Sequence, residues 1–259
     1  MEIHPTAIVS PKAELAQDVR IHAFSVIGPK VTIGAGCEIG PHAVIDGRTT
    51  IGERNRIFPF SSIGLSPQDI SYQNEETRLI IGDDNVIREN VTIHRGSHRG
   101  DGATILGSQT YIMAYVHIAH DCRIGNRVIM ANVATLGGHV HVGDYATIGG
   151  LVAVHQFVRV GMYSFVGGKA AVRMDIPPYM LAVGAAAAKL YGPNIIGLKR
   201  NGFPAEAIQA LKKSYRILFR SGLILKDATE RVRREVQMCP EVEHLLEFMS
   251  GVSKRGITR

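Results

Sequence analysis

The sequence lacks tryptophan, has few aromatic residues of any kind and contains only three cysteines. Aromatic residues make up 6% of the 259 residues, and Cys37, Cys122 and Cys239 share no C-x-x-C spacing. An odd number of cysteines without that spacing disfavours both a disulfide framework and a thiolate zinc site. We therefore interpret the three cysteines as packing residues in a reducing compartment.

Long hydrophobic runs are missing as well. No stretch reaches the roughly 18 apolar residues that a membrane span requires. The amino terminus, MEIHPTAIVS, has no charged segment followed by an apolar one, which is the pattern of a secretion signal. We expect a cytoplasmic chain that is not exported and has no membrane span.

The net charge of +6 is confined to the last quarter of the chain. Of the 29 Lys and Arg residues, 13 lie from Lys199 onward together with 7 of the 23 Asp and Glu residues, so the remaining 16 of each sign cancel. Such a segment either attracts an acidic partner at long range or is simply the solvated surface of helices. It lacks interleaved aromatic residues and any recognised module, so nucleic-acid binding has little support.

A period of six residues dominates what the sequence does contain. Aliphatic residues occupy every sixth position from Ile3 to Ile63, again from Ile81 to Ile93, and, one residue out of phase, from Leu106 onward to residue 172. This period is the signature of a parallel β-helix, in which each hexad forms a short strand and a corner. Three hexads make one coil, so residues on adjacent coils are 18 apart. The predicted fold class is all-β, followed by a small α-helical domain.

Two breaks in this pattern predict two inserted loops, at 65–79 and 95–105. The hexads end near residue 190, so we predict a β-helix over 1–189 and a helical C-terminal domain over 190–259. The helical domain would cap the open end of the coil, as the terminal elements of solenoids generally do.

Helical spacing of apolar residues marks three segments of that C-terminal domain. The first begins at Pro204, which suits the start of a helix, and ends at Gly222, which suits its termination. The other two are predicted over 226–238 and 241–249.

Glycine often follows the aliphatic residue of a hexad, as at Gly28, Gly34, Gly40 and Gly52. Glycine at this point suits a chain that turns tightly or adopts a positive φ. We therefore expect these glycines to be the residues that turn the corners.

The repeat converts sequence separation into distance, because equivalent residues on adjacent coils lie about 4.8 Å apart. His120 is predicted to lie over Gly138, and Asp121 over His139. A group of histidines thereby collects within three coils: His117, His120, His139, His141 and His155. Histidines on a rigid scaffold form either a general-base site or a metal site. A neutral imidazole can take a proton from a hydroxyl group, as acyl transfer to an alcohol requires.

Zinc is the alternative reading of this histidine group. Some hexapeptide-repeat proteins, the γ-class carbonic anhydrases, bind zinc through histidines across a subunit boundary. That family pairs two histidines five residues apart, whereas His117 and His120 are three apart and follow no carboxylate-rich signature. We therefore expect no metal and no other cofactor.

Five short segments carry a more specific signal than the hexapeptide period. They are IHRG at 93–96, HIAHDC at 117–122, VHQF at 154–157, DIPPY at 175–179 and GLKR at 197–200. Together they resemble the UDP-N-acetylglucosamine acyltransferase family of lipid A biosynthesis, and the similarity runs nearly end to end.

This resemblance implies a left-handed β-helix and a homotrimer with sites between subunits. It also implies transfer of an (R)-3-hydroxyacyl group from acyl carrier protein to the 3-hydroxyl of UDP-N-acetylglucosamine. The basic C-terminal domain would then serve as a docking surface for the acidic carrier protein. The reading kept as an alternative is a coenzyme-A-dependent acetyltransferase, and a non-enzymatic scaffold is the third.

The resemblance further implies a role for individual residues. His120 matches the general base, and Gly138 matches the residue whose backbone N–H stabilises the oxyanion. Asp121 would orient or charge-balance His120, although the spacing of the repeat points its side chain elsewhere. The substrate-binding positions implied are Gln68, Asp69, His117, His139, His155, Gln156, Gly168, Asn194 and Arg200. Gln68 and Asp69, on the first inserted loop, would reach a neighbouring subunit's site.

The acyl and nucleotide contacts are also implied by the resemblance. Gly168 is expected to continue the acyl groove beyond His155 and Gln156, and a glycine there admits a long acyl chain. The sequence departs from the usual family pattern at three positions near the acceptor: Ser71 replaces a lysine, Ile196 a glutamate and Asn201 an arginine. These departures bear on the nucleotide contacts, not on catalysis.

Overall fold

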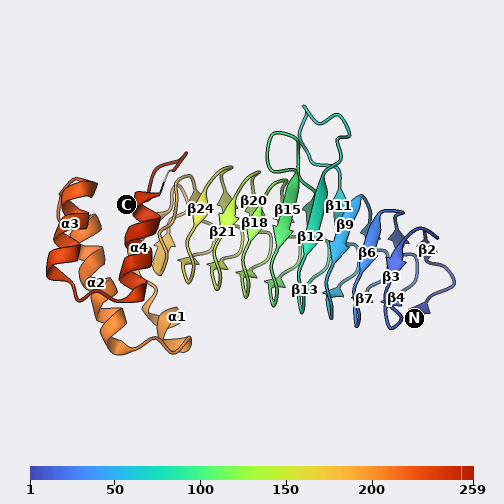
Figure 1. Ribbon diagram of the computed structural model, residues 1–259, viewed down its shortest axis with the longest axis horizontal. Helices are drawn as coiled ribbons and strands as arrows, with labels where there is room; N and C mark the ends of the chain where they lie inside the picture. Colours follow the sequence, from blue (N-terminus) through green and yellow to red (C-terminus); the bar gives the residue numbers. More distant parts are fainter. Residues whose placement is uncertain (252) are drawn as a thin grey trace.

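The computed structural model describes residues 1–251 and 253–259 as an elongated parallel β-helix with a group of helices at one end (Figure 1). Short strands form three sheets that run the length of the coil. All strand pairs are parallel except the last, in which β27 and β28 are antiparallel. The predicted architecture of a β-helix followed by helices is confirmed.

Each sheet takes every third strand of the chain, because each coil contributes one strand to each face. Sheet A contains β1 (Glu2–Ile3), β4 (Arg20–Ile21), β7 (Glu38–Ile39), β10 (Arg56–Ile57), β13 (Val86–Ile87), β16 (Tyr111–Ile112), β19 (Ile129–Met130), β22 (Thr147–Ile148), β25 (Phe165–Val166), β27 (Met180–Val183) and β28 (Lys189–Pro193). Sheet B contains β2 (Ile8–Val9), β5 (Val26–Ile27), β8 (Val44–Ile45), β11 (Ser62–Leu65), β14 (Thr92–His94), β17 (His117–Ile118), β20 (Thr135–Leu136), β23 (Ala153–Val154) and β26 (Ala171–Val172). Sheet C contains β3 (Glu14–Leu15), β6 (Val31–Ile33), β9 (Arg48–Ile51), β12 (Arg78–Ile81), β15 (Ala103–Leu106), β18 (Arg123–Ile124), β21 (His141–Val142) and β24 (Arg159–Val160).

The register of the sheets follows the predicted spacing of 18 residues. His117 pairs with Thr135 in sheet B, and Arg123 pairs with His141 in sheet C. The aliphatic residue of each hexad points inward, so that from Ile21 to Val172 the coil encloses a continuous column of buried side chains. Burial of each such side chain stabilises the fold by about 1.5–3 kcal/mol. Each coil is therefore fixed against the next by its own core.

The glycines after these aliphatic residues serve a different purpose from the one expected. Gly28, Gly34, Gly40 and Gly52 do not have positive φ; the left-handed residues of the corners are mostly not glycine, and Phe24 and His42 are examples. A Cβ at Gly34 would instead lie 2.6 Å from the carbonyl oxygen of Gly52 on the next coil. These glycines therefore allow adjacent coils to approach each other.

Four helices lie within the described residues and cover the open end of the coil (Figure 1). They are α1 (Ile195–Arg200), α2 (Ala205–Arg220), α3 (Leu225–Glu235) and α4 (Pro240–Ser250). The last three match the predicted helical segments to within a few residues. Helix α1 was not predicted; the side chain of Asn194 caps it by accepting a bond from the Gly197 N–H. Strand β28 crosses the expected domain boundary at residue 189.

The two inserted loops project from the same side of the coil and lie together (Figure 1). The first lies between β11 and β12 and the second between β14 and β15, so both are slightly shorter than expected because the strands extend into them. Glu75 on the first loop pairs with His98 on the second, with 2.8 Å between Oε1 and Nδ1.

We expect Ile112→Ala to lower the free energy of unfolding by about 2–5 kcal/mol, because Ile112 is fully buried in the column. Ile129 on the adjacent strand is the matched control, since it is 40% exposed and points outward. Ile129→Ala should cost less than about 1 kcal/mol. Denaturant titration of both variants checks the expectation, and equal losses would contradict the inward column.

Candidate active site

The candidate site lies at the corner where sheet B passes into sheet C. Two columns of residues meet there on three successive coils. One column holds His120, Gly138 and Gln156, and the other holds Asp121, His139 and Phe157. The three residues of the second column all have positive φ, between 59° and 66°. A non-glycine residue pays roughly 1–2 kcal/mol for this conformation, so the surrounding coil must impose it.

His120 and Asp121 form a hydrogen-bonded pair at this corner. The distance between His120 Nδ1 and Asp121 Oδ2 is 2.8 Å, and the two side chains are 16% and 3% exposed. The spacing of the repeat pointed the Asp121 side chain elsewhere. The structure corrects this, because the left-handed backbone at Asp121 turns the carboxylate back toward the preceding residue.

The second inserted loop holds the Asp121 carboxylate in place. Ser97 donates to Oδ2 from both its backbone N–H, at 3.0 Å, and its hydroxyl, at 2.7 Å. Burial raises the pKa of Asp121, but the hydrogen bonds from His120 and Ser97 outweigh it and the net pKa is lowered. A Cβ at Gly100 would lie 2.4 Å from the carboxylate carbon, so the loop passes directly over it.

Gly138 leaves room for the imidazole of His120. A Cβ at Gly138 would lie 2.6 Å from His120 Cε1 and 2.8 Å from Nε2. Gly138 is buried and its φ is not positive, so the glycine is required for space and not for backbone conformation. Among residues 1–251 and 253–259, no acceptor is found for the Gly138 N–H. A free donor therefore lies next to the imidazole.

Other histidines surround this pair. His117 Nδ1 lies 2.7 Å from Thr92 Oγ1, and its ring meets that of His94 edge-on at 5.2 Å. Burial lowers the pKa of His117, and it lowers the pKa of His94 to about 4. His139 lies edge-on to His120 at 5.1 Å, and burial lowers its pKa as well. These three imidazoles are therefore neutral at pH 7.

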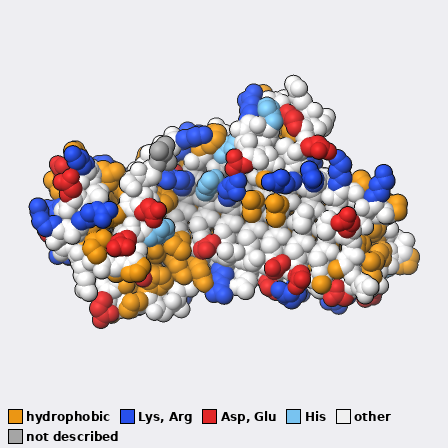
Figure 2. Space-filling model, in the orientation of Figure 1, with side chains coloured by type: hydrophobic (Ala, Val, Ile, Leu, Met, Phe, Trp, Pro, Cys, Tyr) orange, Lys and Arg blue, Asp and Glu red, His pale blue; other side chains and the backbone are white. Residues whose placement is uncertain are grey.

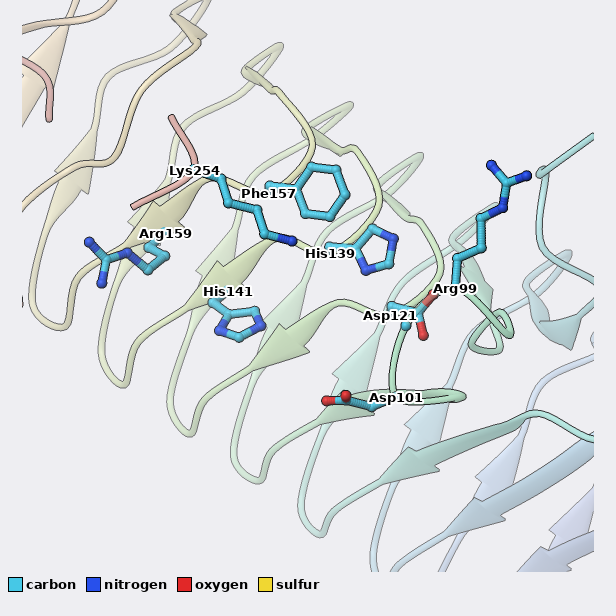
Figure 3. A pocket seen from close by; sticks show the side chains of 9 residues that line it. Arg99, Asp101, Asp121, His139, His141, Phe157, Arg159 and Lys254 are labelled. Carbon is cyan, nitrogen blue, oxygen red and sulfur yellow. The ribbon is translucent and has the colours of Figure 1, made fainter. Parts of the chain in front are cut away.

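A pocket of about 360 Å³ opens beside the corner (Figure 3). The residues that line it come from three parts of the chain: Arg99, Gly100 and Asp101 from the second loop, Asp121, His139, His141, Phe157 and Arg159 from the coil, and Lys254 from the C-terminal tail. The ring of Phe157 stacks on His139 at 4.4 Å, and Lys254 Nζ lies 4.4 Å from the Phe157 centroid. The tail thus reaches the site through Phe157.

The first inserted loop is held next to the coil by Arg95. Its guanidinium donates to Gly64 O at 2.9 Å, to Ser66 Oγ at 3.1 Å and to Tyr72 Oη at 3.1 Å. Asp69 accepts from the backbone and hydroxyl of Ser71, which lower the pKa of its carboxyl. Ser71, which stands where the family usually has a lysine, therefore orders the Asp69 carboxylate.

Comparisons with known proteins agree with this geometry. A model described as UDP-N-acetylglucosamine O-acyltransferase, domain 2, matches residues 175–258, and the bacterial transferase hexapeptide model matches residues 3–47 and 103–138. An acyl-[acyl-carrier-protein]–UDP-N-acetylglucosamine O-acyltransferase of Syntrophobacter fumaroxidans is 64% identical over 259 residues, 100% of both chains. One of Thermodesulfovibrio yellowstonii is 55% identical and covers 100% of this chain and 99% of its own.

Solved structures extend the comparison to the fold. The UDP-N-acetylglucosamine O-acyltransferase of Moraxella catarrhalis is 41% identical, covers 100% of both chains and superposes with a TM-score of 0.96. The Arabidopsis enzyme is 32% identical, with coverage of 99% of this chain and 100% of its own and a TM-score of 0.85. The chain belongs to the UDP-N-acetylglucosamine O-acyltransferase family. It is an acyltransferase with the left-handed parallel β-helix of that family.

The acyltransferase fold brings together only part of the predicted site. His117, His120, Asp121, Gly138 and His139 meet at the corner between sheets B and C. His155 and Gln156 follow on the next coil, where both are exposed. The first loop carries Gln68, which is exposed, and the half-buried Asp69.

Asn194 and Arg200 lie on a different face. They line a largely apolar pocket of about 700 Å³ between sheet A and α1, together with Ile196 and Asn201. Figure 2 shows hydrophobic side chains gathered at this junction between the coil and the helices. One chain therefore does not place Asn194 and Arg200 next to His120.

The position of Gly168 differs from the one expected. It does not continue the wall of the corner beyond His155 and Gln156. It lies at the corner between sheets A and B, in a shallow pocket with Asn132 and Gly150. Residues at the same corner are separated by multiples of 18. The separation between His120 and Gly168 is not such a multiple, so the two residues belong to different corners.

Sequence reasoning missed Ser97, Arg95 and Lys254 as supports of the site. Ser97 and Arg95 lie at or in the inserted loops, where the six-residue period gives no positional information. Lys254 follows the last helix, and its approach depends on tail contacts such as the bond from Arg255 Nε to Gln156 O. The net charge of the last quarter was the only signal for it.

We expect Gly138→Ala to lower kcat by about 10²-fold, because the added methyl group must displace the His120 imidazole. The matched control is Gly150→Ala, whose Cβ would come no closer than 3.3 Å, to Asn132 O. Imidazole resonances in ¹H–¹⁵N spectra should shift for His120 in the first variant only. Normal kcat and an unmoved imidazole in Gly138→Ala would refute the steric argument.

Proposed function

We propose that this chain transfers an (R)-3-hydroxyacyl group from acyl carrier protein to the 3-hydroxyl of UDP-N-acetylglucosamine, the first step of lipid A biosynthesis. The observation that carries the proposal is a histidine hydrogen-bonded to a buried carboxylate directly above a free backbone N–H. This combination supplies a base and an oxyanion donor, which are the two requirements of acyl transfer from a thioester.

His120 acts as the general base. Because Nδ1–H donates to Asp121, the lone pair of Nε2 is available to accept the proton of the sugar hydroxyl. The sugar oxygen attacks the thioester carbonyl carbon, the C–O bond forms and the C–S bond then breaks. The imidazolium returns its proton to the departing thiolate, so that a free thiol on the carrier and an ester on the sugar result. Asp121 keeps the imidazole oriented and stabilises its charged form.

Gly138 supplies the donor for the oxyanion. The negative charge that develops on the carbonyl oxygen needs a hydrogen bond that is already in place, since such donors are worth about 10²–10³-fold in rate. The Gly138 N–H is fixed on the rigid coil one level from His120. His117 and His139, held neutral by burial, are placed to bond the uncharged sugar hydroxyls.

Two chains are needed to complete the site. Asn194 and Arg200 lie beside sheet A, whereas His120 lies at the corner between sheets B and C. The guanidinium of Arg200 suits a diphosphate, because it donates two parallel bonds. A homotrimer in which sheet A of one chain faces the His120 corner of the next would join the two halves.

An apolar ridge along the corner between sheets A and B supports self-association. Its exposed side chains have positive φ and occupy the same corner position on different coils: Phe24, Phe60, Tyr115, Val133 and Leu151. His42 and Asn90 occupy that position on the coils between them. A ridge of this length is unusual on a protein without a partner.

The basic C-terminal helices are the proposed docking surface for the acidic carrier protein. Among the described residues, no helix has the length and apolar character to cross a bilayer, and we propose a cytoplasmic location.

His120→Ala should lower kcat by 10²–10⁴-fold, as loss of a general base does, without changing the thermal midpoint or the oligomeric state. His4→Ala, on the exposed first coil, is the control and should retain full activity. The measurement is transfer from a 3-hydroxyacyl carrier protein to UDP-N-acetylglucosamine. A His120 variant that keeps a tenth or more of the rate would sink the assignment, as would activity that is lost on chelation and restored by zinc.

In the proposed homotrimer sheet A of one chain faces the His120 corner of the next, so Gly168, at the edge of sheet A, would line the neighbouring chain's acyl groove. Gly168→Met should therefore shift the preference toward acyl chains several carbons shorter. Gly168 is exposed, and a Cβ there lies 3.2 Å from Gly150 O, so the long side chain would extend into the shallow pocket of that corner. Each methylene excluded from burial forfeits about 0.8 kcal/mol. We would measure kcat/KM over a series of donor lengths, with the shortest donors as the internal control. An unchanged length profile would remove Gly168 from the acyl groove.

A further inference from the structure

We propose that His120, Asp121 and His139 form an inhibitory site for a divalent transition-metal ion, of which zinc is the best match. One nitrogen of each imidazole and one carboxylate oxygen lie within 4.8 Å of one another. Two imidazoles and one carboxylate are a ligand set typical of zinc, with a fourth position left for water. The metal would act as an inhibitor and not as a cofactor, because its ligands are the proposed catalytic pair.

The ion would take the place of the proton that His120 shares with Asp121. His120 Nδ1 and Asp121 Oδ2 are 2.8 Å apart. Two ligand atoms about 2.1 Å from a tetrahedral ion stand roughly 3.4 Å apart, so the pair needs to open by only a fraction of an ångström. His139, edge-on to His120 with ring centroids at 5.1 Å, supplies the third ligand from the next coil.

A second observation points to a ligand at the same place. Asp121 Oδ1 is buried and has no hydrogen-bond partner among the described residues, whereas Oδ2 accepts from Ser97 and His120. A buried carboxylate oxygen without a partner is unfavourable, and an ion bound through both carboxylate oxygens would satisfy Oδ1 while it replaces the shared proton on Oδ2. The Ser97 bonds meanwhile act as the outer shell that orients a ligating carboxylate.

The pocket beside the corner gives an ion access. Asp121 and His139 line the pocket, which is open to solvent, and Figure 3 shows His139 and Asp121 side by side in its wall. His139 presents its ring edge-on to His120 at this opening. The cations Arg99 and Lys254 at the rim oppose entry, which favours a tightly coordinating metal over magnesium or calcium.

The inhibitory effect rests on the proposed function of His120 as the general base. Metal binding is argued from the geometry of the three ligands and does not depend on that function. A metal bound to the lone pair of His120 Nδ1 leaves the ring proton on Nε2, so Nε2 has no lone pair with which to accept the proton of the sugar hydroxyl. Proton transfer and metal binding therefore exclude each other.

The test is direct binding of metal to the intact protein after EDTA treatment and removal of the chelator. Zinc is titrated by calorimetry, and Co²⁺ by the visible absorption of a four-coordinate site. We expect one ion per chain at micromolar concentration, and at least tenfold weaker binding in Asp121→Asn and His139→Ala. His22→Ala is the matched control, because His22 pairs with the carboxylate of Glu38 at 3.0 Å on a distant coil, and it should bind zinc normally.

Activity is measured separately on the same samples. Zinc should inhibit acyl transfer at the concentration at which it binds, and EDTA should restore the full rate. The proposal is overturned if zinc binds with equal strength to Asp121→Asn and His139→Ala, or if the His22 variant loses the site, since the ion then sits elsewhere. It is also overturned if no binding occurs below 1 mM. Binding without inhibition of an active enzyme would overturn the inhibitory role, and binding to an enzyme with no acyl transfer would count against the proposed function instead.

Discussion

The stacking of one coil on the next is the constraint on which the rest of the structure depends. Side chains such as Ile112, Ile118 and Val154 fill the centre of the coil, and a shift of one residue would turn each of them outward. The register of 18 residues is therefore strongly fixed. The two columns of the active corner take their backbone positions from it, and the contacts of His120 with Asp121 and of His139 with Phe157 then orient the side chains. The left-handed conformation at Asp121 and His139 is tolerated for the same reason.

This constraint also explains how much could be predicted from the sequence. The coil, the three faces and the placement of His120 over Gly138 follow from a period that repeats without knowledge of any long-range contact. The direction of the Asp121 side chain does not, because it depends on Ser97 in an inserted loop and on a backbone conformation that asparagine, aspartate and histidine adopt more readily than most residues. The resemblance to the family supplied the pairing of Asp121 with His120 where the period misdirected it.

The glycines and the C-terminal segment show two further limits. Glycine has two physical uses, positive φ and the absence of a Cβ, and a sequence pattern does not separate them; Gly34 and Gly138 both serve the second use. Helix α1 is short and begins with an asparagine cap after an irregular β-pair, so it has no amphipathic period to detect. The separation of Gly168 from His120 in the repeat places Gly168 on another corner. The sequence-based expectation for Gly168 instead followed the family resemblance.

The histidine cluster is compatible with one corner of a rigid coil only if most of its members are uncharged. Burial lowers the pKa of His94, His117 and His139, so these rings do not repel one another or the imidazolium that forms on His120 during the reaction. The lowered pKa of Asp121 keeps one negative charge against that imidazolium. Had the neighbouring rings been exposed and protonated, they would have opposed the same charge that Asp121 stabilises. The buried corner in which Gly138 leaves room for the imidazole thus sets the electrostatics of the base as well as its position.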